Sequence, residues 1–281
     1  DSDGNLWIGY AGGIQIFNGK IYRTIRDQQL FKDTRINALQ RWDDTMWVAT
    51  GNAGIHRYRN GTWTWFQPMS EGGPGFYETD SMTVDYAGKT LVIATLHKGV
   101  WIVNASSDPL GFRRIDSYGD LPPMLHVKPN PLGGAYIFDD HTISRYSAGP
   151  GLTPLLSVSD LTANPVEIND LTAIPDGTLY IGTDDGIFIW KDGVVLRHLG
   201  GVDGIGTSPV VLWLFADIQG RVWFATQESV GYYAAGETSL PLITVQVIDQ
   251  TSPTVTVTPP EQTLPPVTTR IPAMSDEPVR T

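Results

Sequence analysis

In the stretch DGNLWIGY, residues 3–10, a turn of small polar residues leads into a large apolar residue, a β-branched one and a small one. The same order of residue types returns five times further along the chain. We call the large residue of each copy its anchor; the anchors are Trp7, Trp47, Val92, Tyr136, Tyr180 and Trp223. Successive anchors lie about 40 to 45 residues apart, which is the length of one four-stranded propeller blade.

The segments around each anchor supply the other strands that a blade needs. A short apolar segment precedes the anchor, as in RINALQ (35–40), and a strand-like segment follows it, as in GGIQIF (12–17). Small residues after the anchor, such as Gly9 and Gly182, would let neighbouring blades approach closely. The sequence therefore predicts an all-β protein, a β-propeller of about six visible four-stranded blades over residues 1–248, or of seven if the chain is cut from a longer one.

The two ends of the sequence leave one question about the ring open. Nothing precedes Asp1, so the first blade lacks its inner strand in this chain. Either the chain is cut from a longer propeller, or LITVQVID (242–249) or SPTVTVTP (252–259) completes that blade. Residues 249–281 are rich in Thr and Pro and nearly free of aromatic residues, which predicts a linker or stalk, or the start of an Ig-like module.

Composition excludes some classes of partner and chemistry. The chain has 19 Lys and Arg residues against 30 Asp and Glu residues, a net charge of −11, which opposes binding to nucleic acid and to anionic membranes. It has no cysteine, so it has no disulfide, no thiolate metal site and no cysteine nucleophile. No cofactor is expected, and we expect neither a nucleic-acid partner nor membrane contact by this segment.

The repeat resembles a known family. DSDGNLWIG (1–9), followed by GGIQIFNGK (12–20), is similar to the two-component regulator propeller repeat of the extracytoplasmic sensor regions of bacterial histidine kinases and related receptors. Residues at the first and fourth positions of that motif are Asp1, Asp217, Gly4, Gly177 and Gly220. Elsewhere the chain departs from the motif, since Arg41 replaces the first Asp and Val92 replaces the aromatic anchor.

The resemblance implies a ligand-sensing or binding domain of a bacterial signal-transduction receptor. Its ligand would be a carbohydrate or another polar small molecule, bound at the face that carries the loops. The location implied is extracytoplasmic, periplasmic or at the cell surface, within a larger membrane-anchored protein. A homodimer formed through the parent receptor is a further expectation of the same kind.

The opening residues also permit a different interpretation, a calcium loop. Asp1, Asp3 and Asn5 would offer oxygens at alternate positions, but no distant bidentate Glu follows them. The equivalent stretches of the other repeats keep a turn and lose the oxygens. We therefore interpret the stretch as a tight turn and expect no metal site.

An enzyme is the main alternative function. Two carboxylates on converging loops could hydrolyse or cleave a glycan, as in a glycoside hydrolase or a lyase. The candidate carboxylates are Asp139, Asp140, Asp184, Asp185 and Glu228. None lies in a recognisable glycosidase phrase, so no catalytic residue is assigned and the protein is not expected to be an enzyme. A scaffold for protein partners is the second alternative.

The best candidate for a binding surface is the propeller rim that carries the long connections between blades and the short loops after the anchor strands. These loops mix aromatic, amide and charged side chains, as a polar ligand requires. The predicted ligand-binding residues are Arg35, Asn52, Tyr77, Glu78, His97, Lys98, Asp140, Asp184 and Glu228.

Overall fold

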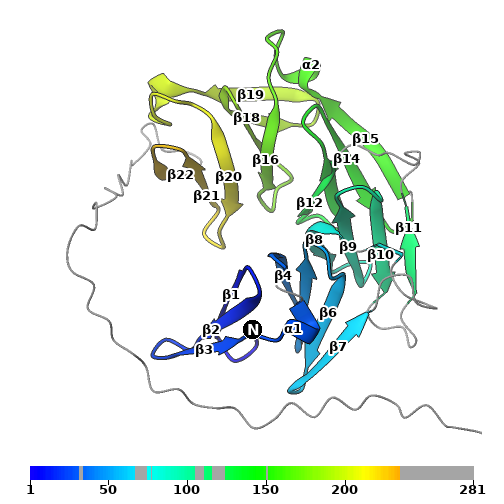
Figure 1. Cartoon of the computed structure of the whole chain (residues 1–281). Helices are drawn as coiled ribbons and strands as arrows, with labels where there is room; N and C mark the ends of the chain where they lie inside the picture. Colours follow the sequence, from blue (N-terminus) through cyan, green and yellow to red (C-terminus); the bar gives the residue numbers. More distant parts are fainter. Residues whose placement is uncertain are drawn as a thin grey trace, which may run out of the picture.

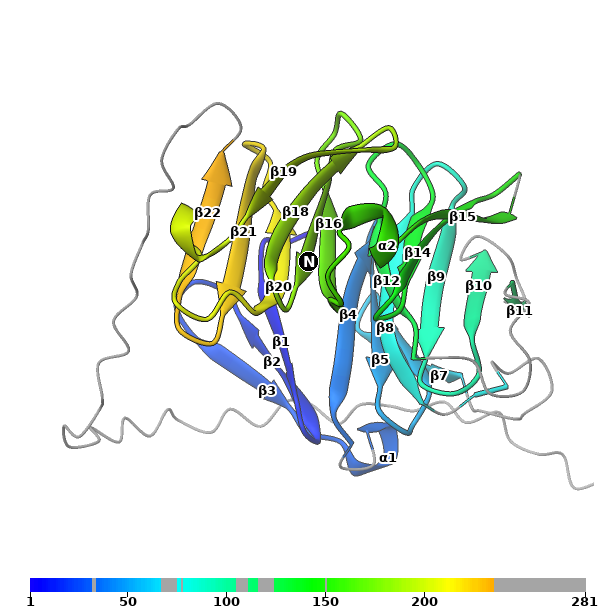
Figure 2. The same ribbon diagram turned by 90° about the horizontal axis from the view of Figure 1, so that it is seen from above.

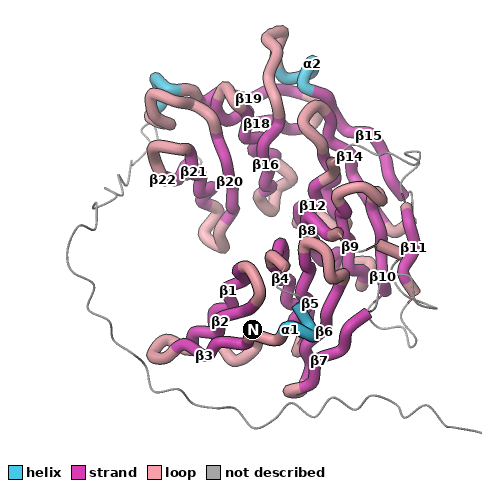
Figure 3. The backbone as a smooth tube through the Cα atoms, viewed as in Figure 1, coloured by secondary structure: helices cyan, strands magenta, loops and turns pink. Residues whose placement is uncertain are grey.

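The computed structural model shows six antiparallel sheets arranged one after another around a common centre (Figure 1). It describes residues 1–31, 34–66, 75–76, 78–104, 111–115, 124–149 and 151–234. Almost all regular structure in this part of the chain is strand, with short helical turns only (Figure 3). The protein is therefore an all-β propeller of about six blades, and the prediction of fold class is confirmed.

Each sheet is one blade, and its strands follow one another in chain order. Blade 1 contains β1 (Leu6–Tyr10), β2 (Gly13–Phe17) and β3 (Tyr22–Ile25). Blade 2 contains β4 (Ile36–Trp42), β5 (Thr45–Thr50), β6 (Ile55–Arg59) and β7 (Thr62–Phe66). Blade 3 contains β8 (Thr79–Asp85), β9 (Thr90–Thr95), β10 (Val100–Asn104) and β11 (Phe112–Arg114).

Blade 4 contains β12 (His126–Pro129), β13 (Ala135–Phe138), β14 (Thr142–Ser147) and β15 (Gly151–Ser157). Blade 5 contains β16 (Ile168–Ala173), β17 (Leu179–Thr183), β18 (Gly186–Lys191) and β19 (Val194–Leu199). Blade 6 contains β20 (Val211–Ala216), β21 (Arg221–Thr226) and β22 (Val230–Ala234). The short helices are α1 (Gln28–Phe31), α2 (Val158–Leu161) and the 3-10 turn η1 (Gly201–Asp203). None of these described helices is long and apolar enough to span a membrane.

Among the described residues, blade 1 has three strands, β1, β2 and β3, and no strand pairs with β1 on its inner side. Blade 6 also has three strands among the described residues, ending with β22. Residues 235–281 lie outside the described part of the chain, so the two candidate closing strands and the Thr/Pro-rich linker remain predictions. The domain boundary after residue 248 is likewise a proposal.

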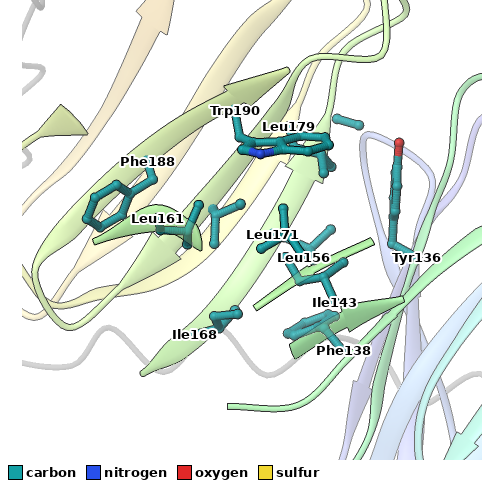
Figure 4. Close-up of a cluster of buried hydrophobic side chains, with 12 residues drawn as sticks. Tyr136, Phe138, Ile143, Leu156, Leu161, Ile168, Leu171, Leu179, Phe188 and Trp190 are labelled. Carbon is teal, nitrogen blue, oxygen red and sulfur yellow. The ribbon is translucent and has the colours of Figure 1, made fainter. Parts of the chain in front are cut away.

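The core consists of the interfaces between neighbouring blades. Figure 4 shows one of them, where Tyr136 and Phe138 of blade 4 meet Leu171, Leu179 and Trp190 of blade 5. All of these side chains are buried. Between blades 1 and 2, α1 adds buried apolar side chains to the same kind of interface (Figure 2). Removal of this apolar area from water is the main force that holds the blades together.

Glycine after the anchor is required by the spacing of the blades. A Cβ atom on Gly9 would lie 2.6 Å from Cγ2 of Ile36 in the next blade, and one on Gly182 would lie 2.7 Å from Cγ1 of Val211. Both distances are well below van der Waals contact between carbon atoms. The predicted role of these small residues is confirmed at both interfaces.

Inner strands of the middle blades also join through side chains. Ser81 Oγ accepts a hydrogen bond from Val127 N at 2.9 Å, and Thr172 Oγ1 accepts one from Ala216 N at 3.2 Å. β20 is the last inner strand in chain order. Its positions equivalent to Ser81 and Thr172 are occupied by Trp213 and Phe215. Their rings stack at 5.7 Å and are 48% and 50% exposed. The last blade thus presents an apolar face where earlier inner strands present polar side chains.

Candidate ligand-binding site

The propeller has two faces that carry different loops. Because successive strands of a blade run in opposite directions, the connection that leads into an inner strand and the loop between the second and third strands lie on one face. We call it the mouth face. The turns that follow the inner strands lie on the opposite face, which we call the turn face. The predicted ligand-binding residues that the structure describes all belong to loops of the mouth face.

A pocket of about 530 Å³ opens on the mouth face where blades 2, 3 and 4 meet. Residues from β4, β8 and the loops before and after strands line it: Arg35, Ile36, Asn37, Gly51, Asp80, Leu96 and Met124. Its volume lies within the usual range for sites that hold a small molecule. The lining combines a guanidinium, an amide and a carboxylate with three apolar side chains.

Asp80 lies at the pocket and forms an ion pair with His126 of the next blade. The distance between Asp80 Oδ2 and His126 Nδ1 is 2.7 Å, and both side chains are largely covered. Burial lowers the pKa of His126, but the hydrogen bond and the negative charge of Asp80 outweigh it, so that the pKa lies above its ordinary value. The pair therefore favours the protonated form of His126.

Three more polar contacts join the inner strands of neighbouring blades. Asn37 donates from Nδ2 to the carbonyl oxygen of Thr79 at 2.7 Å. Lys128 Nζ lies 2.7 Å from a carboxylate oxygen of Asp170, and that carboxylate also accepts from Leu214 N at 2.8 Å. The acceptor of Asn37 lies in blade 3, and the acceptor of Lys128 lies in blade 5. Each bond therefore joins a blade to the next one and holds the polar side chains in a fixed geometry.

Several of the predicted residues lie near this pocket. Arg35 lines it, and Glu78 lies two positions before Asp80. Glu78 and His97 approach each other at 3.9 Å, with both side chains exposed. Asn52 and Lys98 are exposed on the short loops of blades 2 and 3. Tyr77 lies outside the described residues.

The other predicted residues, on blades 4, 5 and 6, form local contacts and do not line the pocket. Asp184 Oδ1 accepts from Glu167 N at 3.0 Å, and Glu228 Oε2 accepts from Thr207 Oγ1 at 2.7 Å. Each carboxylate thereby fastens the connection that leads into its own blade. Asp140 pairs with the adjacent His141 at 2.7 Å, with both side chains exposed. The structure does not bring these carboxylates to the pocket.

The remaining candidates for acid chemistry are also engaged locally. Asp139 Oδ1 accepts from the backbone N–H groups of His141 and Thr142 and from the Thr142 hydroxyl. The Asp185 carboxylate lies 3.9 Å from Nε2 of His198, and the Asp185 backbone N–H donates to Thr183 Oγ1. Within the described residues, Asp139, Asp140 and His141 are the one group of side chains close enough together to share a metal ion. Their hydrogen bonds belong to the turn itself.

Sequence reasoning did not select Asn37, Asp80, Leu96, Met124 or His126 for the site. A signal does exist: Asn37 and Asp80 are polar residues at the second position of an inner strand. That position lies where the strand leaves the rim and enters the central channel. A polar residue there, inside an apolar strand, indicates the channel mouth.

No protein-family model and no curated protein sequence matches the chain. The chain does resemble proteins of known structure. The extracellular domain of the putative hybrid two component system BT4673 from B. thetaiotaomicron is 18% identical, with a TM-score of 0.50, over 83% of this chain and 37% of that one. The structure described as YCF48 bound to D1 peptide is 13% identical, with a TM-score of 0.62, over 85% and 77%. The WD40 β-propeller domain of Doa1 is 11% identical, with a TM-score of 0.60, over 84% and 76%.

At these identities the likeness concerns the fold alone. It places the chain in the class of β-propellers, in agreement with the six sheets around a common centre. The chain spans little more than a third of the BT4673 extracellular domain that it matches.

Proposed function

We propose that this propeller is a ligand-sensing domain of a bacterial signal-transduction receptor and that it binds a carbohydrate or another polar ligand at the mouth face. The observation that carries the proposal is the pocket of about 530 Å³ beside the Asp80–His126 pair. It joins charged groups to an apolar wall in one concave site, which is the usual composition of a binding pocket.

The chemistry of the lining suits a ligand rich in hydroxyl groups. Arg35 offers several N–H donors, and the carboxylate of Asp80 offers acceptor oxygens to hydroxyl hydrogens. Leu96 and Met124 supply apolar contact for the C–H face of a sugar ring, and Met124 is 55% exposed at the rim. Such a site gains both hydrogen bonds and burial of apolar area when a saccharide binds.

Two further facts support the sensor role. The repeat resembles the two-component regulator propeller motif, and one structural neighbour is the extracellular domain of a two component system. By analogy, we propose that the domain lies outside the cytoplasmic membrane within a larger membrane-anchored protein. Signal output would come from other parts of that protein, and a homodimer of the parent is one route for it.

We further propose that the domain is not an enzyme. The rim carboxylates that could act as acid and base, Asp184 and Glu228, are occupied in fastening the connections before β16 and β20. A catalytic pair must instead be free to reach a reacting bond. No specific observation therefore favours a glycoside hydrolase, a lyase or a protein scaffold.

The test is a thermal-shift screen of the full 281-residue chain against neutral oligosaccharides of glucose, mannose, galactose and xylose. A ligand that binds only the folded state must raise the midpoint of unfolding. We expect at least one saccharide to do so, and we expect Arg35→Ala to abolish the shift. Arg23→Ala is the matched control, because Arg23 is exposed on β3 away from the pocket. No shift with any saccharide, or an equal shift in Arg35→Ala, would refute the proposal.

A further inference from the structure

A second, smaller pocket of about 230 Å³ lies on the turn face of blade 2, opposite to the mouth face. Side chains of β4, β5, β6 and the turn between the first two of these strands line it: Trp42, Asp43, Asp44, Thr45, Trp47, Arg57 and Arg59. The pocket includes the anchor of its blade, Trp47. Trp47 differs from the other two tryptophan anchors, Trp7 and Trp223, in the hydrogen bonding of its indole N–H.

In blades 1 and 6 an aspartate accepts the hydrogen bond of the anchor indole. Trp7 Nε1 donates to Asp1 Oδ2 at 2.7 Å, and Trp223 Nε1 donates to Asp217 Oδ2 at 2.9 Å. In blade 6 the same oxygen also accepts from Arg221 Nε at 2.6 Å. Blade 6 thus holds one carboxylate jointly by an indole N–H and a guanidinium, whereas in blade 1 the partners of the carboxylate are the Trp7 indole and the Asn5 amide.

Blade 2 keeps the indole and loses the carboxylate. The residue six positions before Trp47 is Arg41, whose Nε donates instead to the carbonyl oxygen of Asp43 at 3.0 Å. Trp47 is 1% exposed, and its Nε1 has no hydrogen-bond partner among the described residues. A buried donor without an acceptor is unfavourable and uncommon in native structures.

Two arginines, Arg57 and Arg59, line the same pocket as Trp47. The Arg57 guanidinium lies 5.9 Å from the centre of the Trp47 ring and 5.5 Å from that of Phe66. Arg59 pairs with Asp44 at 3.2 Å, with both side chains about half exposed. The second acidic residue of the lining, Asp43, is exposed on the turn. The exposed Arg59–Asp44 pair can rearrange at little energetic cost, because such surface pairs are weak.

We propose that this pocket binds a small organic carboxylate, which takes the place that Asp1 and Asp217 occupy in the other blades. The ligand carboxylate accepts from Trp47 Nε1 and from the Arg57 guanidinium, while Trp42 and Trp47 provide apolar walls. Its size suits one compact group, such as a free acid or a single uronic acid residue. The site is separate from the saccharide pocket of the mouth face and does not depend on it.

The test follows indole N–H signals by NMR in ¹⁵N-labelled full-length protein during titration with D-glucuronate, D-glucose or acetate. Comparison with Trp47→Phe assigns the Trp47 signal. We expect glucuronate to shift this signal and glucose, which lacks the carboxylate, to leave it unchanged. A shift with acetate as well assigns the site to free carboxylates, whereas a shift with glucuronate alone assigns it to sugar-borne ones; both support the proposal. No shift with either acid would overturn it.

Arg41→Asp gives an independent test, because it restores the aspartate of the repeat. The new carboxylate should accept from Trp47 Nε1, weaken glucuronate binding about thirtyfold or more and raise the midpoint of unfolding. Arg23→Asp makes the same change in net charge at an exposed site on β3 and should bind like the wild type. Undiminished binding by Arg41→Asp, or equal losses in both variants, would contradict the proposal. Arg35→Ala should leave this binding unchanged, which separates it from the mouth-face site.

Discussion

Asp1 shows what the conserved order of residues in the repeat does at the atomic scale. Its Oδ1 accepts from the backbone N–H groups of Asp3 and Asn5, and its Oδ2 accepts from Asn5 Nδ2 and Trp7 Nε1. Both oxygens are used within the turn and on the anchor. The predicted tight turn is present, and the residues that resemble a calcium loop instead fix the direction in which the anchor strand begins.

Asp217, the residue of blade 6 that is equivalent to Asp1, should make the free energy of unfolding depend on pH. Burial raises the pKa of Asp217, but hydrogen bonds from Trp223 and Arg221 outweigh it and lower the pKa to about 2, from 3.8. A folded-state pKa below the unfolded value stabilises the fold above pH 4 or so, and this contribution is lost as the pH falls towards about 2. We expect Asp217→Asn to unfold at a lower temperature than the wild type at pH 6.

The measurement is the midpoint of thermal unfolding of both proteins between pH 6 and about pH 2. The difference between them should shrink as the carboxylate becomes protonated. A difference that stays constant across this range would mean that the charge of Asp217 does not stabilise the fold.

His126 and Asp80 give a second prediction at the residue scale. Since the pKa of His126 is raised in the folded state, the pair stabilises the fold below pH 6.5 or so and loses its contribution as the pH rises through the folded-state pKa. Asp80→Asn removes the partner charge and should lower the pKa of His126. Titration of the His126 ring signals by NMR measures both values directly, and an unchanged pKa in the variant would exclude the pairing.

Within the blades, the distance between neighbouring sheets depends on the small residue two positions after the anchor. Because a Cβ on Gly182 would lie 2.7 Å from Val211 Cγ1, Gly182→Ala must displace β20 from β17. We expect a loss of about 1–3 kcal/mol in the free energy of unfolding, as for other overpacked cores. Denaturant unfolding measures it.

Controls for Gly182→Ala come from the same chain. Gly149→Ala meets no atom within 4 Å and should be nearly neutral. Adding Val211→Ala to Gly182→Ala removes the clashing methyl groups and should recover part of the loss, unless the alanine acts through the unfolded state. Equal effects at Gly149 and Gly182 would contradict the packing explanation.

The elements could be predicted from sequence because their signal is local and periodic. Anchors, small residues and turns recur at a fixed spacing, so that even PLGGAYIFD, with few motif residues, contains a turn and the anchor strand β13 of blade 4. The candidate site was less predictable. Asp80 and His126 are 46 positions apart and meet only because successive inner strands pack side by side. Within the sequence of its own strand, each is a single polar residue with no indication of its partner.

The contacts of the rim carboxylates could not be predicted from sequence, for a different reason. Asp184 and Glu228 lie in the loops where the sequence placed them, yet their oxygens bind the connections before β16 and β20. A sequence shows that a carboxylate lies on a loop, but not which N–H group or hydroxyl satisfies it. Only the fold decides between a solvated acid, a ligand contact and a structural acceptor.

At the scale of the whole molecule, the first and last blades are the ends of the row in Figure 1, and they expose apolar side chains. Trp213 and Phe215 are half exposed on β20, and Leu6 of β1 is 58% exposed. We expect the full-length protein to bind an apolar fluorescent dye at this surface. The double variant Trp213→Ser, Phe215→Thr should reduce dye fluorescence and leave the midpoint of unfolding almost unchanged, because these rings pack mainly on each other.

A matched control for the dye experiment is Tyr86→Ser, since Tyr86 is 66% exposed on a turn of blade 3. Its dye binding should equal that of the wild type. If the double variant binds as much dye as the wild type, the apolar face of β20 is covered in the full-length protein.

The central claim is that the mouth face of this propeller binds a polar ligand between Arg35 and Asp80. Calorimetric titration of the saccharide with the largest thermal shift into wild-type and Asp80→Asn protein, side by side, tests it most directly. We predict binding by the wild type and a loss of about tenfold or more in affinity for Asp80→Asn, because the variant removes a charged acceptor from the pocket. Equal affinities for the two proteins would show that the ligand does not bind at Asp80.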